Sequence, residues 1–116
     1  MKKSLIDTNL IIRFLVNDDP KKAFRVKSLF LNKKTKNILL DVIVAEIIWV
    51  LSSYYELEKL SVIEKVRALI HLETVECNKD LIERSLSIWE RNNISYIDSY
   101  IAAFSEIHEI KIYSYD

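Results

Sequence analysis

The sequence contains no glycine and only one cysteine among its 116 residues. Phosphate-cradling P-loops and dinucleotide-binding fingerprints depend on glycine for tight turns and close backbone approach, so both are excluded. The single cysteine, Cys77, excludes an internal disulfide and a zinc site built from cysteines. Several common nucleotide-binding and metal-binding classes are therefore ruled out before any motif is considered.

An excess of charge and a long apolar run are also missing. Lys and Arg total 17 and Asp and Glu total 17, so no general basic field favours nucleic acid. The longest uncharged run, Ile47 to Tyr55, has nine residues, far fewer than a membrane span needs. Lys2 and Lys3 resemble the start of a signal peptide, but the apolar run after them ends at Asp7. We expect a cytoplasmic protein without a membrane segment, on which any nucleic-acid surface is local.

Hydrophobic residues make up 50% of the chain. Segments in which they follow a strand-like spacing alternate along the chain with segments of helix-like spacing. Strands are predicted at 3–7, 37–40, 73–77 and 110–115, and helices at 10–16, 20–31, 61–70, 81–91 and 96–108, with a further helix that starts at 41 and carries Glu46. Helix caps are predicted at Thr8 and Asn9, at Asp19, in a Ser61–Glu64 capping box, and at Ser95. Strands separated by helices predict an α/β fold with a parallel sheet and helices on its faces.

The stretch DVIVAEIIWVL, from Asp41 to Leu51, places one carboxylate in an otherwise apolar segment. From Val42 to Leu51 every residue except Glu46 is apolar, which predicts that the segment is buried. A buried carboxylate needs a compensating partner. We expect that partner to be either Arg13 or a metal ion.

Three further acids stand beside Glu46 as candidates for one site. Asp7 ends the first predicted strand, Asp116 ends the last, and Asp98 lies on a helix between them. Each has an ordinary explanation: Asp7 as a helix cap, Asp98 as the acid of a capping pair with Ser95, and Asp116 as a solvated terminal acid. Together they predict an all-oxygen site for Mg²⁺ or Mn²⁺, and the chemistry we infer is phosphodiester hydrolysis.

Four segments of the chain resemble the PIN-domain family, and more closely the VapC-type ribonuclease toxins of bacterial and archaeal toxin–antitoxin pairs. They are IDTNLIIRFLVNDDP (6–20), DVIVAEIIWVLSSYYELEK (41–59), LIERSLSIWERNN (81–93) and ISYIDSYIAAFSEI (94–107). The resemblance implies one domain over residues 1–116, a three-layer sandwich whose central parallel sheet has four or five strands. It also implies a metal-dependent endoribonuclease that a cognate antitoxin inhibits and that pairs with a second copy.

The resemblance also assigns site residues. Asp7, Glu46 and Asp98 match the family's first three acids, and Asp116 is similar to the acid that closes the site. Asn9, with Thr8 beside it, matches the polar position that supports the first acid or contacts a phosphate. The chain departs from the family pattern by stopping at Asp116, where relatives usually continue. Two interpretations stay open, a disordered Asp116 or a domain shortened at its C-terminus, and the fourth ligand is weakened in either case.

A local excess of basic residues offers a possible substrate surface. Seven basic residues and no acid lie between Pro20 and Leu40. Within this segment Lys33, Lys34 and Lys36 are the candidates for contact with an RNA backbone. The alternatives are a solvated face and, by resemblance, an antitoxin-binding surface.

Two other functions remain open. A PIN-like module without activity would act by binding RNA or protein. A phosphoacceptor or phosphatase-type domain would use Asp7 as nucleophile, but the chain has Asn9 where that class carries a second aspartate. Asp41, His71 and His108 are expected to be structural or surface residues.

Overall fold

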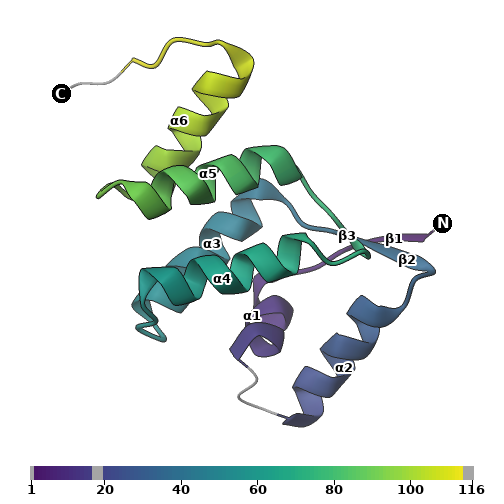
Figure 1. Ribbon diagram of the computed structural model, residues 1–116. Coiled ribbons are helices and arrows are strands. Elements are labelled where there is room, and N and C mark those ends of the chain that lie inside the picture. The colour runs from purple at the N-terminus through teal and green to yellow at the C-terminus, as the bar shows by residue number, and fades with distance from the viewer. Residues whose placement is uncertain (1, 17–19, 114–116) are drawn as a thin grey trace. The chain divides into compact units, whose positions relative to one another are not determined.

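The computed structural model describes residues 2–16 and 20–113, with the side chains of residues 22 and 23 left aside. The chain divides into two compact units, Met1–Cys77 and Asn78–Asp116. The first unit contains, in chain order, β1 (Lys2–Leu5), α1 (Thr8–Val16), α2 (Pro20–Leu31), β2 (Thr35–Ile38), α3 (Asp41–Ser53), α4 (Lys59–Ile70) and β3 (Val75–Glu76). The second contains α5 (Lys79–Arg91) and α6 (Tyr96–His108) (Figure 1).

The sheet of the first unit is parallel and has the strand order β1-β2-β3. Lys2 is paired with Thr35 at the start of the register, and Asn37 is paired with Val75 further along. The α/β class with a parallel sheet flanked by helices is therefore confirmed. Among the described residues the sheet has three strands, so the prediction of four or five was wrong there.

The missing strand was predicted at 110–115. Its described part, 110–113, has no regular secondary structure, and the remainder lies outside the described residues. The backbone turns back after α6, because Glu109 adopts a left-handed conformation with a φ of 54° and the Ile110 N–H donates to the Ser105 carbonyl. The alternation Ile110-Lys111-Ile112-Tyr113 is strand-like in sequence, but strand pairing needs a neighbouring strand that sequence alone does not supply.

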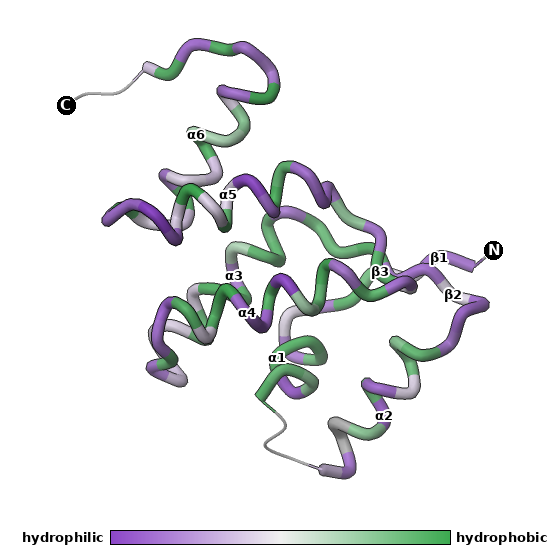
Figure 2. The backbone as a smooth tube through the Cα atoms, in the orientation of Figure 1, coloured by the Kyte–Doolittle hydropathy of each residue, from purple (hydrophilic) through white to green (hydrophobic). Residues whose placement is uncertain are grey.

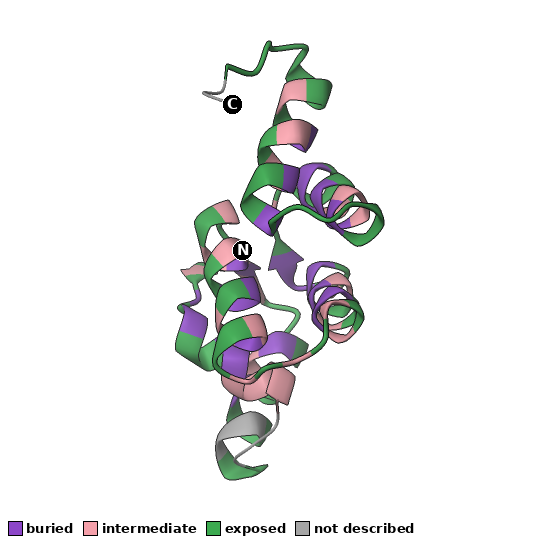
Figure 3. Cartoon of the chain, turned by 90° about the vertical axis from the view of Figure 1, so that its left-hand side faces the viewer, coloured by how far each residue is buried: buried purple, intermediate pink, exposed green. Residues whose placement is uncertain are grey.

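The core of the first unit forms between the sheet and helices whose apolar residues recur every three or four positions. α1 is hydrophobic along most of its length, whereas α2 alternates between hydrophobic and hydrophilic residues (Figure 2). Helices of this kind carry buried residues on one side and exposed residues on the other (Figure 3). The fully buried side chains of this unit include Ile11, Val44, Ile47, Leu51, Val62, Val66, Leu69 and Ile70.

Helix ends in this unit depart from the predictions. α4 begins at Lys59 after Glu58, so Ser61 is its third residue and the predicted Ser61–Glu64 capping box was wrong. α3 ends where the Leu57 N–H donates to the Leu51 carbonyl at 3.0 Å, with the left-handed Glu56 (φ 53°) between them. Glycine is the usual residue at left-handed positions that follow helices.

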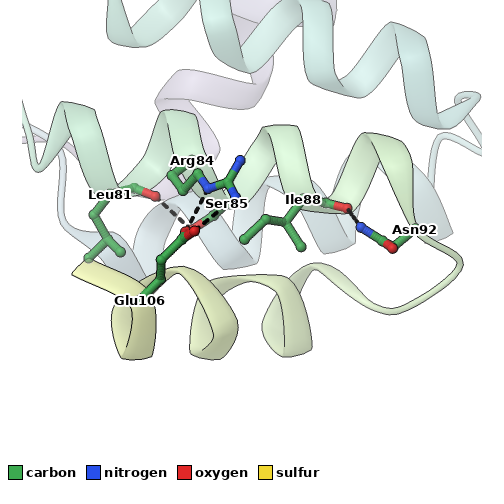
Figure 4. Close-up of polar contacts among 6 residues, drawn as sticks. All are labelled: Leu81, Arg84, Ser85, Ile88, Asn92 and Glu106. Atoms are coloured by element: carbon green, nitrogen blue, oxygen red, sulfur yellow. Dashed lines mark hydrogen bonds and ion pairs between the residues drawn. The ribbon is translucent and has the colours of Figure 1, made fainter. Parts of the chain in front are cut away.

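The second unit is a pair of contacting helices. Arg84 of α5 donates two hydrogen bonds to the Glu106 carboxylate of α6, at 2.6 and 3.0 Å (Figure 4). These hydrogen bonds lower the pKa of Glu106 below its ordinary value and raise the pKa of Arg84. At the other end of the pair, Trp89 packs edge-on against Tyr96 with ring centroids 5.8 Å apart. An ion pair and an aromatic contact therefore join the two helices.

Candidate functional site

Asp7 lies at the carboxyl end of β1, where sites form in parallel sheets. Its side chain is exposed, and its Oδ1 accepts a hydrogen bond from the Leu10 backbone N–H at 3.1 Å. Asp7 is therefore the residue that caps α1. The predicted caps, Thr8 and Asn9, were wrong, because α1 already begins at Thr8. The hydrogen bond uses one carboxylate oxygen and leaves the other available to a ligand.

The polar residues after Asp7 differ in exposure. Thr8 is 6% exposed, and its hydroxyl has no hydrogen-bond partner among the described residues. Asn9 is exposed in the first turn of α1. Of the two side chains, only Asn9 is therefore accessible from outside, whereas Thr8 faces its buried neighbours.

Glu46 is exposed, so the prediction that it is buried was wrong. α3 is apolar around most of its circumference, but only one side, with Val44, Ile47, Ile48 and Leu51, is buried. Val42, Glu46, Trp49 and Ser53 share the opposite side, because residues three, four and seven positions apart lie on one helix face. An exposed carboxylate needs no partner, and within the described chain no ion pair joins Glu46 to Arg13.

The elements that carry these two acids are neighbours in the first unit. α1, which follows Asp7 directly, contacts α3, which carries Glu46. Two exposed carboxylates on adjoining elements offer the hard oxygen donors that Mg²⁺ and Mn²⁺ prefer, so their chemistry fits such an ion. Within 2–16 and 20–113, no group of three or more acidic, histidine or cysteine side chains could hold a metal.

Asp98 belongs to the second unit and lies in the first turn of α6. Its backbone N–H donates to the Ser95 hydroxyl at 3.0 Å, which confirms the predicted cap at Ser95. The Asp98 side chain is exposed. A carboxylate here also complements the positive end of the helix dipole. Asp116, the fourth acid of the predicted site, lies outside the described residues.

The lysines predicted to contact RNA are partly engaged in the fold. Lys33 forms an ion pair with Glu73 at 3.5 Å, and Lys36 Nζ donates to the Glu73 carbonyl at 2.8 Å. Lys34 is exposed, and only its backbone N–H is used locally, in a bond to Asn32. Of the three, Lys34 is the one whose side-chain charge has no ion pair or hydrogen bond among the described residues.

The remaining residues singled out by the sequence take ordinary positions. Asp41 begins α3 and is half-buried. His71 follows the last turn of α4, and His108 ends α6 beside Phe104, with ring centroids 4.1 Å apart. No helix in the described parts of the chain has the length and apolar character that crossing a membrane requires.

A hollow of about 410 Å³ lies in the second unit, between α6 and the segment that follows it. Its lining is mainly apolar and aromatic, with Tyr100, Phe104 and Tyr113 among its residues. The three candidate acids that the structure describes, Asp7, Glu46 and Asp98, do not line it.

The first unit thus falls into the class of parallel α/β domains that place exposed acids at and near the carboxyl end of a strand. The chain belongs to the PIN domain family, whose family model matches residues 4–116 and so spans both units. PIN domains are generally nucleases and commonly use divalent metal ions. No curated protein matches the chain significantly.

Proposed function

We propose that this PIN domain is a metal-dependent endoribonuclease of the VapC type, which hydrolyses RNA and is inhibited by a cognate antitoxin. The observation that carries the proposal is the pair of exposed carboxylates, Asp7 and Glu46, on adjoining elements of the first unit. Acids exposed in this way are available to a cation, which in turn can bind a phosphate, whereas acids buried in ion pairs are not available.

In this proposal Asp7, Glu46 and Asp98 hold Mg²⁺ or Mn²⁺, and Asp116 assists. The ion would supply activation of water and charge stabilisation at phosphorus. The Leu10 N–H fixes the orientation of the Asp7 carboxylate through its 3.1 Å hydrogen bond, which limits the rotamers that this side chain samples. Asn9 contacts a substrate phosphate. Lys34 precedes the amino end of β2, at the other end of the sheet from Asp7, and neutralises a more distant part of the RNA backbone. The products are a 5′-phosphate and a 3′-hydroxyl.

The proposal is tested by incubating a panel of structured RNAs with the protein in Mg²⁺, Mn²⁺ or EDTA. Asp7→Asn and Glu46→Gln are expected to abolish metal-dependent cleavage. Glu64→Gln is the matched control, because Glu64 is an exposed acid of the same unit on α4. Cleavage that survives both site substitutions would show that the reaction occurs elsewhere.

A second candidate function is a PIN-like module that binds RNA or protein without cutting. The observation favouring it is that the described residues contain no group of three side chains able to hold a metal. Thermal unfolding with and without Mn²⁺ separates the two. For the nuclease, the free energy of unfolding is expected to rise by about 2.7 kcal/mol at a hundredfold excess of Mn²⁺ over its dissociation constant. For the inert module it is expected to stay unchanged.

The antitoxin and a second copy of the chain complete the proposal. An antitoxin segment is proposed to lie across the acids and to exclude RNA. Sedimentation of the protein alone, and an RNA-cleavage assay with the co-expressed antitoxin, test the two partners separately.

A further inference from the structure

The exposed face of α3 carries a tryptophan beside the candidate acid. Trp49 is 66% exposed and Val42 is 68% exposed, with Glu46 on the same face. Tryptophan is highly buried on average, and the other tryptophan of this chain, Trp89, is only 9% exposed. Trp49 lies three residues after Glu46, which corresponds to a rise of about 4.5 Å along the helix.

We infer that Trp49 is a stacking platform for a nucleobase of the RNA substrate, beside the nucleotide whose phosphate would be bound by the cation that Asp7 and Glu46 hold. The inference rests on the proposed function and names a subsite for it. Aromatic side chains stack on unpaired bases of any sequence, because every base has a flat π-face. Single-stranded RNA presents such bases, splayed away from the backbone.

The charge on this face favours a base over a second protein copy. An interface between identical copies around a twofold axis brings the same surface of each copy together. An interface of this kind centred on this face would bring two Glu46 carboxylates close together, and the repulsion between their like charges disfavours that arrangement. A nucleobase is uncharged and flat, so it covers the indole and leaves the carboxylate next to it free for its own ligand.

The position of Trp49 also connects the stacking face to the candidate site. α3 contacts α1, and α1 begins directly after Asp7. The same helix therefore offers a carboxylate and, one turn later, an aromatic surface. The arrangement would hold one nucleotide by its phosphate and a neighbouring one by its base, which fixes the strand in one direction.

The fluorescence of Trp49 gives a test that does not depend on cleavage. The sequence has two tryptophans, so Trp89→Phe leaves Trp49 as the sole indole. An Asp7→Asn substitution in the same protein keeps the helix cap, since asparagine is also a good N-cap, and prevents cutting under the proposed function. The probe is an oligouridylate, compared with an abasic sugar-phosphate oligomer of the same length.

The expected result is saturable quenching by oligouridylate and little quenching by the abasic oligomer. Trp49→Ala is expected to weaken oligouridylate affinity about 5- to 140-fold, and to raise KM with little change in kcat in the cleavage-competent protein. Trp49→Phe retains most of the affinity. Tyr54→Ala is the matched control, because Tyr54 is an exposed aromatic at the end of the same helix and is expected to leave affinity unchanged.

Four results would overturn the inference. Equal quenching by the abasic oligomer would mean that the backbone, not a base, is bound near the indole. A Trp49→Ala protein that cuts RNA with an unchanged KM would remove the stacking role while leaving the nuclease intact. A Trp49→Ala protein that sediments as a monomer while the wild type is a dimer, with unchanged RNA affinity, would assign the face to a second copy. A wild type that neither binds nor cuts RNA would overturn the proposed function as well.

Discussion

Replacing Asp7 by asparagine or by alanine separates the two roles that the structure gives this side chain. Its Oδ1 caps α1 through the 3.1 Å hydrogen bond from Leu10, while the exposed carboxylate carries the charge that the proposed cation needs. Asparagine retains an oxygen of the same reach but removes the charge. Alanine removes both. Stability and activity should therefore respond differently to the two substitutions.

The expected magnitudes follow from the capping geometry. Asparagine and aspartate are about equally good N-caps, so Asp7→Asn loses only the interaction of a charge with the helix dipole, about 0.3–1 kcal/mol. Asp7→Ala loses the cap itself, about 0.5–2 kcal/mol, in addition to that charge. Cleavage of RNA is expected to be lost in both, because neither variant supplies an anionic oxygen at the carboxyl end of β1.

Urea denaturation in EDTA measures the first effect and RNA cleavage in Mn²⁺ measures the second. Stability in EDTA should follow the order wild type, Asp7→Asn, Asp7→Ala. The stabilisation by Mn²⁺ should be reduced in both variants. An Asp7→Asn protein that cuts RNA at the wild-type rate would refute the metal-binding role, and an Asp7→Ala protein as stable as the wild type would refute the capping role.

Other substitutions test the core, the helix pair and the basic segment. Leu51→Ala removes a fully buried side chain and should lower the free energy of unfolding by about 2–5 kcal/mol in urea, whereas Leu60→Ala, at an exposed position, should change it by less than about 0.5 kcal/mol. Glu106→Gln should lower the thermal stability at neutral pH. Because the folded pKa of Glu106 is depressed, this difference should vanish as the pH falls through that value, and a difference independent of pH would contradict it. Lys34→Glu should weaken RNA binding and reduce its salt slope by about 1, while Lys79→Glu on α5 should not.

The helices of this protein were largely predictable from sequence because their signals are local. α6 was predicted at 96–108 and runs from Tyr96 to His108, since Ser95 caps it and apolar residues recur at helical spacing. α2 begins at Pro20, the position where a proline fits a helix best. The parallel sheet was predicted from the alternation of strands and helices, and β1, β2 and β3 were each found close to their predicted places.

The predictions that failed were based on which residues a segment contains, and not on the direction in which each side chain points. Glu46 was predicted to be buried because its neighbours in sequence are apolar, but burial depends on which side of α3 faces the core. Glu46 and Ser53 lie seven positions apart on one face, but the apolar Val42 and Trp49 share that face, so a helical wheel alone does not mark it as exposed. The sequence offered both Asp7 and the pair Thr8 and Asn9 as caps of α1, because capping preferences cannot fix the first helical residue; the cap is Asp7.

The members of the candidate site and their assembly into one site both stay predictions. Asp7, Glu46 and Asp98 match the family pattern in sequence, and all three are exposed. Whether their carboxylates share one ion is a question of tertiary placement, and no local pattern encodes it. That convergence stays a prediction, which the paired Asp7→Asn and Glu46→Gln experiments address.

The absence of glycine lowers the stability of the fold at two positions after helices, where the backbone turns left-handed. Glu56 and Glu109 occupy those positions with φ angles of 53° and 54°. For a residue with a Cβ, this conformation is unfavourable by about 1–2 kcal/mol, whereas asparagine tolerates it better and glycine adopts it readily. The chain therefore keeps an unused margin of stability at Glu56 and Glu109. Protein engineering could recover that margin with Glu56→Asn and Glu109→Asn, yielding a more heat-resistant protein in which α3 still presents the same acid and the same indole.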